Sequence, residues 1–171
     1  EIKGIKLVYI PTIETKILSQ PVHSFLSIIH ACFSSPDVIL VVNSANGPFG
    51  LLTKLFKIPT AINVDGLEWL RPKWKGLGSI YFKWASKMAT LFYDQIINDS
   101  DEMRNVYLDL FKRDSNVIAY GANIRKSINP NLINKWNLKQ REYYLVIGRL
   151  IPDNNADLII KGFLKSNSKK K

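Results

Sequence analysis

Two acids, a glycine and two indole rings lie close together between positions 65 and 74. In chain order they are Asp65, Gly66, Glu68, Trp69 and Trp74. Carboxylates accept hydrogen bonds from sugar hydroxyls, and indole rings offer flat apolar faces that suit sugar rings. The pattern predicts a binding site for a hydroxyl-rich, ring-shaped substrate. A plain loop with a solvated Asp65 and two anchoring tryptophans is an equally good interpretation of these residues taken alone.

These side chains directly follow a segment typical of a buried strand. Residues 58–64 are apolar and rich in β-branched side chains, as expected for a strand covered on both faces. In open α/β sheets, ligands bind in the crevice outside the carboxyl ends of the strands. We therefore expect Asp65 at the mouth of a cleft, with Gly66 allowing the backbone to turn or to approach a ligand closely.

Two further loops contain residue types that suit binding. Asn46 and Gly47 follow another apolar segment, and they are interpreted either as part of a substrate pocket or as a plain turn. Gly148 and Arg149 end a third apolar segment. A guanidinium at that place can grip phosphate oxygens through paired, charge-assisted hydrogen bonds, and the amides that begin the next helix add donors.

Residues 99–102 have a simpler interpretation than binding. Ser100 followed by Asp101 and Glu102 matches a side-chain cap and acids that favour the positive end of a helix dipole. Capping accounts for these residues fully.

The elements expected to position these loops alternate along the chain. Strand-like segments lie at 4–10, 37–43, 58–64, 93–98, 115–119 and 143–148, and helical patterns lie at 20–34, 48–57, 75–92, 100–112 and 155–165. This alternation predicts an α/β, Rossmann-like fold with a parallel sheet and helices on both faces.

Composition is that of a soluble globular chain, with 46% hydrophobic and 22% charged residues. Cys32 is the only cysteine and has apolar neighbours, so it is predicted to be a packed thiol. His23 and His30 lack a third ligand, and no metal site is predicted. Since no apolar run approaches the length of a membrane span and no leader is evident, a cytoplasmic location is expected.

The net charge is +10, and the excess of cations is concentrated in residues 69–87. This segment has five cations and no acid, interleaved with aromatic residues. Such a mixture suits a bilayer interface, where rings lie at headgroup depth and lysines meet anionic lipid. A peripheral contact with an anionic membrane surface is one interpretation. The other is a helix whose aromatic side is core and whose lysines are solvated.

Four runs together resemble one known family. They are NVDGLEWLRPKW at 63–74, INDSDEMRNVY at 97–107, VIAYGA at 117–122 and YYLVIGRLIPDNN at 143–155. Their order resembles that of bacterial family 4 glycosyltransferases, in particular the rhamnosyltransferase branch. The resemblance implies a GT-B enzyme with two Rossmann-like domains, of which this chain would be a part. It assigns 1–122 to an incomplete N-terminal acceptor domain, 123–141 to the interdomain connection, and 142–171 to the first strand and helix of a truncated nucleotide-sugar domain.

The implied reaction moves a sugar, rhamnose in that branch, from a nucleotide-sugar donor to a glycan or lipid-linked acceptor. It implies retention at the anomeric carbon, a role in surface polysaccharide synthesis at the inner face of the cytoplasmic membrane, and no cofactor or metal. The implied roles are catalytic for Asp65 and Glu68, substrate-binding for Asn46, Gly47, Gly66 and Trp69, and donor phosphate-binding for Gly148 and Arg149. Asn154 lies where the family has a lysine that contacts the diphosphate.

Two alternatives remain at the level of the sequence. The sequence pI of about 9.7 fits a basic module for nucleic acid or another polyanion. No nucleic-acid motif accompanies that charge, so a nucleic-acid partner is not expected. The second alternative is an inactive piece, because a GT-B site is formed by two domains.

Overall fold

The computed structural model describes residues 4–15, 17–124, 126 and 129–168. The chain divides into two compact units, Glu1–Tyr120 and Gly121–Lys171, which are described separately below. The domain boundaries expected from the sequence stay predictions.

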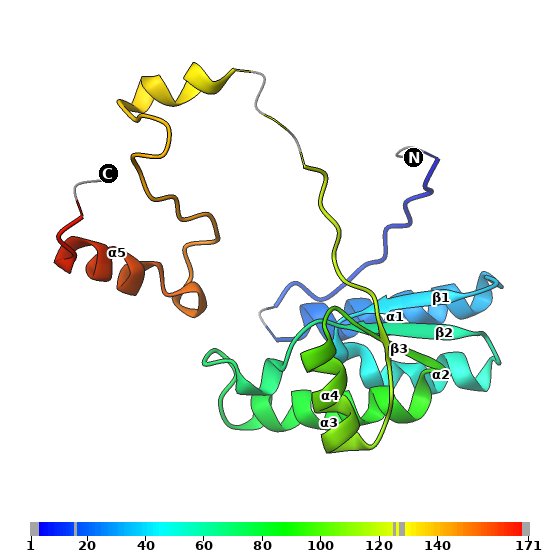
Figure 1. Cartoon of the computed structure of the whole chain (residues 1–171). Coiled ribbons are helices and arrows are strands. Elements are labelled where there is room, and N and C mark those ends of the chain that lie inside the picture. Colours follow the sequence, from blue (N-terminus) through cyan, green and yellow to red (C-terminus); the bar gives the residue numbers. More distant parts are fainter. Residues whose placement is uncertain (1–3, 16, 125, 127–128, 169–171) are drawn as a thin grey trace. The chain divides into compact units, whose positions relative to one another are not determined.

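The first unit is built on a parallel sheet of four strands in the order β1-β2-β3-β4 (Figure 1). The strands are β1 (Ile39–Val42), β2 (Thr60–Val64), β3 (Gln95–Asn98) and β4 (Asn116–Val117). Val42 pairs with Asn63, and Val64 pairs with Asn98, so β1, β2 and β3 end at one edge of the sheet. The α/β class with a Rossmann-like parallel sheet is confirmed.

Helices connect the strands, as parallel pairing requires. In the first unit, the 3-10 helix η1 (Ser44–Phe49) and α2 (Gly50–Leu55) connect β1 to β2, the 3-10 helix η2 (Glu68–Leu70) and α3 (Leu77–Phe92) connect β2 to β3, and α4 (Asp101–Phe111) connects β3 to β4. Another helix, α1 (Ser19–Phe33), precedes β1. The second unit has η3 (Pro130–Trp136), η4 (Pro152–Asn154) and α5 (Ala156–Lys165). The helical patterns read from the sequence are confirmed, although the one at 48–57 begins as a 3-10 turn.

The strands expected at 4–10 and 143–148 are not formed in the described part of the chain. Ile5 makes an isolated bridge, and residues 144–147 have no regular structure. An apolar, β-branched segment indicates a preference for burial, but a strand also needs a neighbouring strand that exchanges hydrogen bonds with it. Side chains such as Tyr9 and Ile147 are exposed instead.

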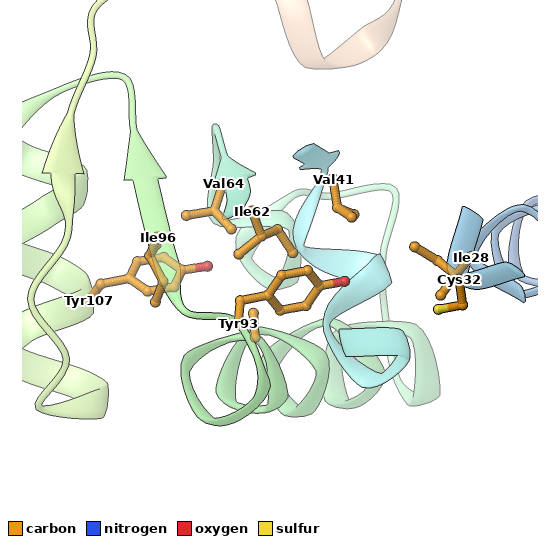
Figure 2. Packing of buried hydrophobic residues seen from close by; sticks show 9 residues of the cluster. Ile28, Cys32, Val41, Ile62, Val64, Tyr93, Ile96 and Tyr107 are labelled. Atoms are coloured by element: carbon orange, nitrogen blue, oxygen red, sulfur yellow. The ribbon is translucent and has the colours of Figure 1, made fainter. Parts of the chain in front are cut away.

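The core lies against one face of the sheet. Ile62 and Val64 of β2 and Ile96 of β3 point to this face, where they meet side chains from α1, α3 and α4. Figure 2 shows the ring of Tyr93 beneath Ile62 and the ring of Tyr107 beside Ile96. Alternation along a strand sends every second residue to one side, which explains why β2 contributes residues 60, 62 and 64 to this buried face.

The opposite face of β1 is open. Leu40 and Val42 are 61% and 55% exposed, so the described helices cover β1 on one face, whereas the sequence predicted helices on both. Cys32 is buried, as expected, and burial raises the pKa of its thiol. Among the described residues, no helix combines the length and the apolar character needed to cross a bilayer.

Candidate functional site at the carboxyl edge of the sheet

The loops that follow β1, β2 and β3 bring polar side chains to one edge. The Asn43 amide donates to the Asn63 carbonyl over 2.9 Å, which joins the first loop to the end of β2. The Asn98 side-chain amide donates to the Val64 carbonyl over 3.2 Å, which joins β2 to β3. The arrangement expected for the strand ends of an α/β sheet is therefore present.

Asn43 has an unusual backbone conformation at this edge. Its φ is 77°, and its side-chain oxygen accepts a hydrogen bond from the Ala45 amide over 2.9 Å. A residue other than glycine pays about 1–3 kcal/mol for such a conformation, and these strained residues cluster at binding sites. The strained backbone of Asn43 therefore makes the loop after β1 a candidate part of a binding site.

Three buried polar atoms at these strand ends have no hydrogen-bond partner within the described residues. They are Ser44 Oγ, Asn63 Oδ1 and Asn98 Oδ1. Buried polar atoms nearly always have a partner from protein, water or ligand. The edge therefore has spare hydrogen-bonding capacity that a water molecule or a hydroxyl-bearing ligand could use.

Asp65 lies directly after β2, and its side chain is exposed. It is close enough to the Tyr107 phenol to affect its titration. Burial is the main cause that raises the pKa of Tyr107 to about 12, the neighbouring Ser86 side chain lowers it, and the negative charge of Asp65 raises it. The edge thus brings the exposed Asp65 side chain near the buried phenol of Tyr107.

Glu68 is only 6% exposed and is fully engaged within its own loop. Its Oε1 lies 2.9 Å from Nε of Arg71, and its Oε2 accepts a hydrogen bond from Trp74 Nε1 over 2.9 Å. Lys73 Nζ lies 3.5 Å from the same Oε2. A buried carboxylate is tolerated when it is paired in this way. The contacts give Glu68 a positioning role in the loop after β2, and its predicted catalytic role stays a prediction.

Arg71 is a cation at this edge that the sequence reasoning missed as a site residue. A Cβ placed on Gly66 would lie 3.2 Å from Arg71 Nη2, so the missing side chain of Gly66 leaves room for the guanidinium. Asp65, Gly66 and Arg71 are thereby neighbours in one loop. The available signal was the acid–arginine spacing of three residues between Glu68 and Arg71, which suits a local ion pair.

The two tryptophans serve mainly the packing of this loop. Trp69 is 8% exposed and packs with Ala45 and Phe82, and its ring meets that of Phe111 edge-on at 6.2 Å between centroids. Trp74 packs on Phe82 at 4.7 Å between ring centroids. The predicted contact of Trp69 with a sugar stays a prediction, and the structure leaves little of its surface free for one.

The loop after β1 also has a structural reason for its glycine. A Cβ on Gly47 would lie 1.9 Å from the Ala85 carbonyl oxygen, so Gly47 permits close packing of η1 on α3. Asn46 Nδ2 donates to the Val42 carbonyl over 2.8 Å, and the Asn46 carbonyl accepts from the Tyr93 hydroxyl over 2.9 Å. The close approach inferred from the sequence exists, but its partner in the structure is a helix.

Gly148 and Arg149 belong to the second unit, where they line a cavity of about 300 Å³. Asn154 and Ala156, the first residue of α5, line the same cavity. The Asn154 side-chain amide donates to the Arg149 carbonyl over 2.7 Å. The second unit thus brings the arginine and the start of a helix together, which is a suitable environment for an anion. Asn154 secures the backbone of Arg149 there.

The fold and this edge define an α/β protein with a parallel sheet whose strand-end loops carry the polar groups. The chain belongs to the family described as Domain of unknown function (DUF1972), whose match spans residues 19–123. That match includes all four strands and the loops that carry Asn43, Asp65 and Arg71. A comparison with curated proteins found no match.

Proposed function

We propose that this chain acts in sugar transfer, with the carboxyl edge of the sheet receiving a sugar or an acceptor hydroxyl. The observation that carries the proposal is the spare hydrogen-bonding capacity at that edge, within the residues that match the family. This family is found in glycosyltransferase-associated proteins, which supports a glycosyltransferase over other α/β proteins. The resemblance of the four sequence runs to family 4 glycosyltransferases points the same way.

In the proposed reaction, an acceptor hydroxyl replaces the diphosphate at the anomeric carbon of a nucleotide-sugar, and the proton of that hydroxyl leaves with the diphosphate or with water. Negative charge grows on the diphosphate as its bond to the sugar breaks. Arg149 and the start of α5 would stabilise that charge, more strongly in the transition state than before it. Neither a cofactor nor a metal takes part in this proposal.

At the carboxyl edge, Asp65 would contact the sugar or the acceptor. Gly66 gives its loop room, and Arg71 with Glu68 would hold that loop in place. The finer identity of the substrates, rhamnose as the sugar and a glycan or lipid-linked acceptor at the inner face of the cytoplasmic membrane, follows the family resemblance and belongs to the proposal.

Ligand-observed NMR with nucleotide-sugars tests the donor half of the proposal. UDP-glucose, GDP-mannose and dTDP-rhamnose serve as probes, with Arg149→Gln compared with Arg141→Gln, an exposed arginine of the same unit. The Arg149 variant should weaken binding about tenfold to a hundredfold, because hydrogen bonds to charged groups contribute about 1.5–3 kcal/mol. Equal affinities for the two variants would remove Arg149 from the proposal.

A basic polyanion-binding module is the rival function, and the net charge of +10 favours it. Oligonucleotide binding measured across a salt series separates the two. A steep loss of binding with salt, together with no response to any nucleotide-sugar, would favour the rival.

A further inference from the structure

Residues of α3 and α4, two helices labelled in Figure 1, line a groove that the proposed transfer reaction does not use. Its volume is about 610 Å³. Ile80, Trp84 and Leu91 of α3 and Leu110 of α4 provide apolar walls, and Lys83, Lys87 and Lys112 provide cations. We refer to these seven residues as the α3–α4 groove.

The sequence of α3 explains why apolar side chains face outward here. Phe82, Ala85 and Ala89 are buried and hold the helix on the domain. Ile80, Trp84 and Leu91 recur at helical spacing on a second face, with Lys83 and Lys87 four residues apart beside them. The helix therefore has one apolar face for the core and a second, mixed face that remains accessible.

The lysines of the groove are free for an external partner. Within the part of the chain that the structure describes, no ion pair involves Lys83, Lys87 or Lys112, and no acid lines the groove. Elsewhere in the cationic segment 69–87, Arg71 and Lys73 pair with Glu68. Of the five cations of that segment, Lys83 and Lys87 at the groove and Lys75 outside it form no ion pair in the described structure.

The apolar walls are equally available. Trp84 is 48% exposed, and Ile80, Leu91 and Leu110 are more exposed still. Adjacent exposed apolar side chains on a soluble domain commonly mark an interaction site. A ligand that satisfies both the walls and the lysines must combine an anionic group with an apolar chain.

We propose that the α3–α4 groove binds an anionic phospholipid at a bilayer surface. The three lysines would contact the phosphate and its neighbours, and the ring of Trp84 with the aliphatic walls would accept the first part of an acyl chain. A second copy of this chain is a poorer occupant, because a two-fold contact would place its lysines against these lysines. The inference goes beyond the transfer reaction and does not require it.

Vesicle co-sedimentation of the whole chain tests the charge requirement. The variant K83Q/K87Q/K112Q is compared with K57Q/K139Q/K165Q, which removes the same charge from exposed lysines outside the groove. On vesicles of phosphatidylglycerol mixed with phosphatidylcholine at low salt, the groove variant should partition roughly 100-fold less, at about fivefold per near-surface lysine. Equal losses in both variants, or no binding by the parent chain, would overturn the proposal.

Trp84 fluorescence tests insertion of the groove into the lipid. Vesicles with acyl chains brominated near the headgroup should quench the parent chain more than Trp84→Phe, which keeps an aromatic ring. Quenching that is unchanged in Trp84→Phe would overturn the groove as the lipid site. A Trp84-dependent dimer in lipid-free buffer, seen by sedimentation equilibrium, would also overturn it. Nucleotide-sugar binding is measured separately, so failure of either proposal leaves the other testable.

Discussion

Glu68 and Arg71 are residue types that often act in catalysis or binding, but here they pair with each other and stabilise the loop after β2. Glu68 is buried and contacts Arg71, Lys73 and the Trp74 indole nitrogen. Because these contacts lie directly after Asp65, they limit the positions that the exposed carboxylate can adopt. The loop after β2 is therefore ordered by an internal ion pair before any ligand arrives.

Replacing Glu68 by alanine should lower the free energy of unfolding by about 2 kcal/mol, since the indole donor loses its partner and the cations lose theirs. Asp109→Ala, which removes an exposed acid of α4, is the matched control and should change stability by about 0.5 kcal/mol or less. Urea denaturation measures both. Similar stabilities for the two variants would show that the Glu68 contacts contribute little.

Gly47 provides a second test at the residue scale. Gly47→Ala should destabilise the fold by about 1–3 kcal/mol or more, because its Cβ would lie 1.9 Å from the Ala85 carbonyl oxygen and the backbones would have to separate. Gly121→Ala is the control, since no atom lies within 4 Å of its added Cβ. Thermal unfolding should separate the two variants clearly. Matching melting temperatures would contradict the tight packing of η1 on α3.

At the residue scale, the sequence predicted the features that depend on residues close by in the chain. Asp65 follows β2 as expected, and Ser100 caps α4 by accepting from the Met103 amide over 3.3 Å, because both depend on near neighbours. The close approach at Gly47 was expected, but its partner was not. Ala85 is distant in sequence, and tertiary packing decided the contact.

At the scale of elements, an exposed ion pair joins α4 to the turn that precedes β4. Arg104 of α4 donates to Asp114 from Nε over 2.7 Å and from Nη2 over 3.0 Å. These hydrogen bonds, together with the Ser115 amide, lower the pKa of Asp114 from 3.8 to about 2. The pair fixes the turn that returns the chain to the sheet.

The depressed pKa of Asp114 sets the sign of a pH effect. The contribution of the pair to stability is present above the unfolded value of 3.8 and is lost as the pH falls toward about 2. Asp114→Asn should therefore be less stable than the parent chain at neutral pH, and the difference should shrink through this acid range. Denaturation curves at several pH values measure it. A constant difference across the range would contradict the assignment.

The sequence predicted strands correctly where another strand of the same chain pairs with them. The patterns at 58–64 and 93–98 became β2 and β3, which pair with each other. The equally apolar segment 143–148 formed no strand in the described structure, since no neighbouring strand pairs with it. The pattern of apolar residues shows that a segment favours the strand conformation. Whether it forms a strand also depends on a neighbouring strand that can exchange hydrogen bonds with it.

At the scale of the whole molecule, the two units differ in how much they bury. Every buried residue of the described chain lies in the first unit, between Ile28 and Tyr107. A buried backbone amide exchanges its hydrogen with water only after the structure around it has unfolded locally or globally, so burial slows this exchange. The two units should therefore respond differently to a probe of local stability.

Hydrogen exchange followed by NMR should find the slowest amides in β2 and β3, around Ile62, Val64 and Ile96. Amides of α5 should exchange much faster, since no residue of that helix is buried in the structure as described. Comparable protection of α5 and β2 would contradict this difference between the units.

The tight seat of Gly47 and the amide contact of Asn46 also have a chemical consequence for the ageing of the chain. Asn–Gly pairs in unfolded chains readily lose ammonia through a succinimide ring, which forms when the following backbone nitrogen attacks the side-chain carbonyl carbon. Here the Asn46 amide is held by the Val42 carbonyl over 2.8 Å, and Gly47 is wedged against α3. The native fold therefore protects this pair from deamidation. The rate at which isoaspartate accumulates at position 46 would report how often this loop opens.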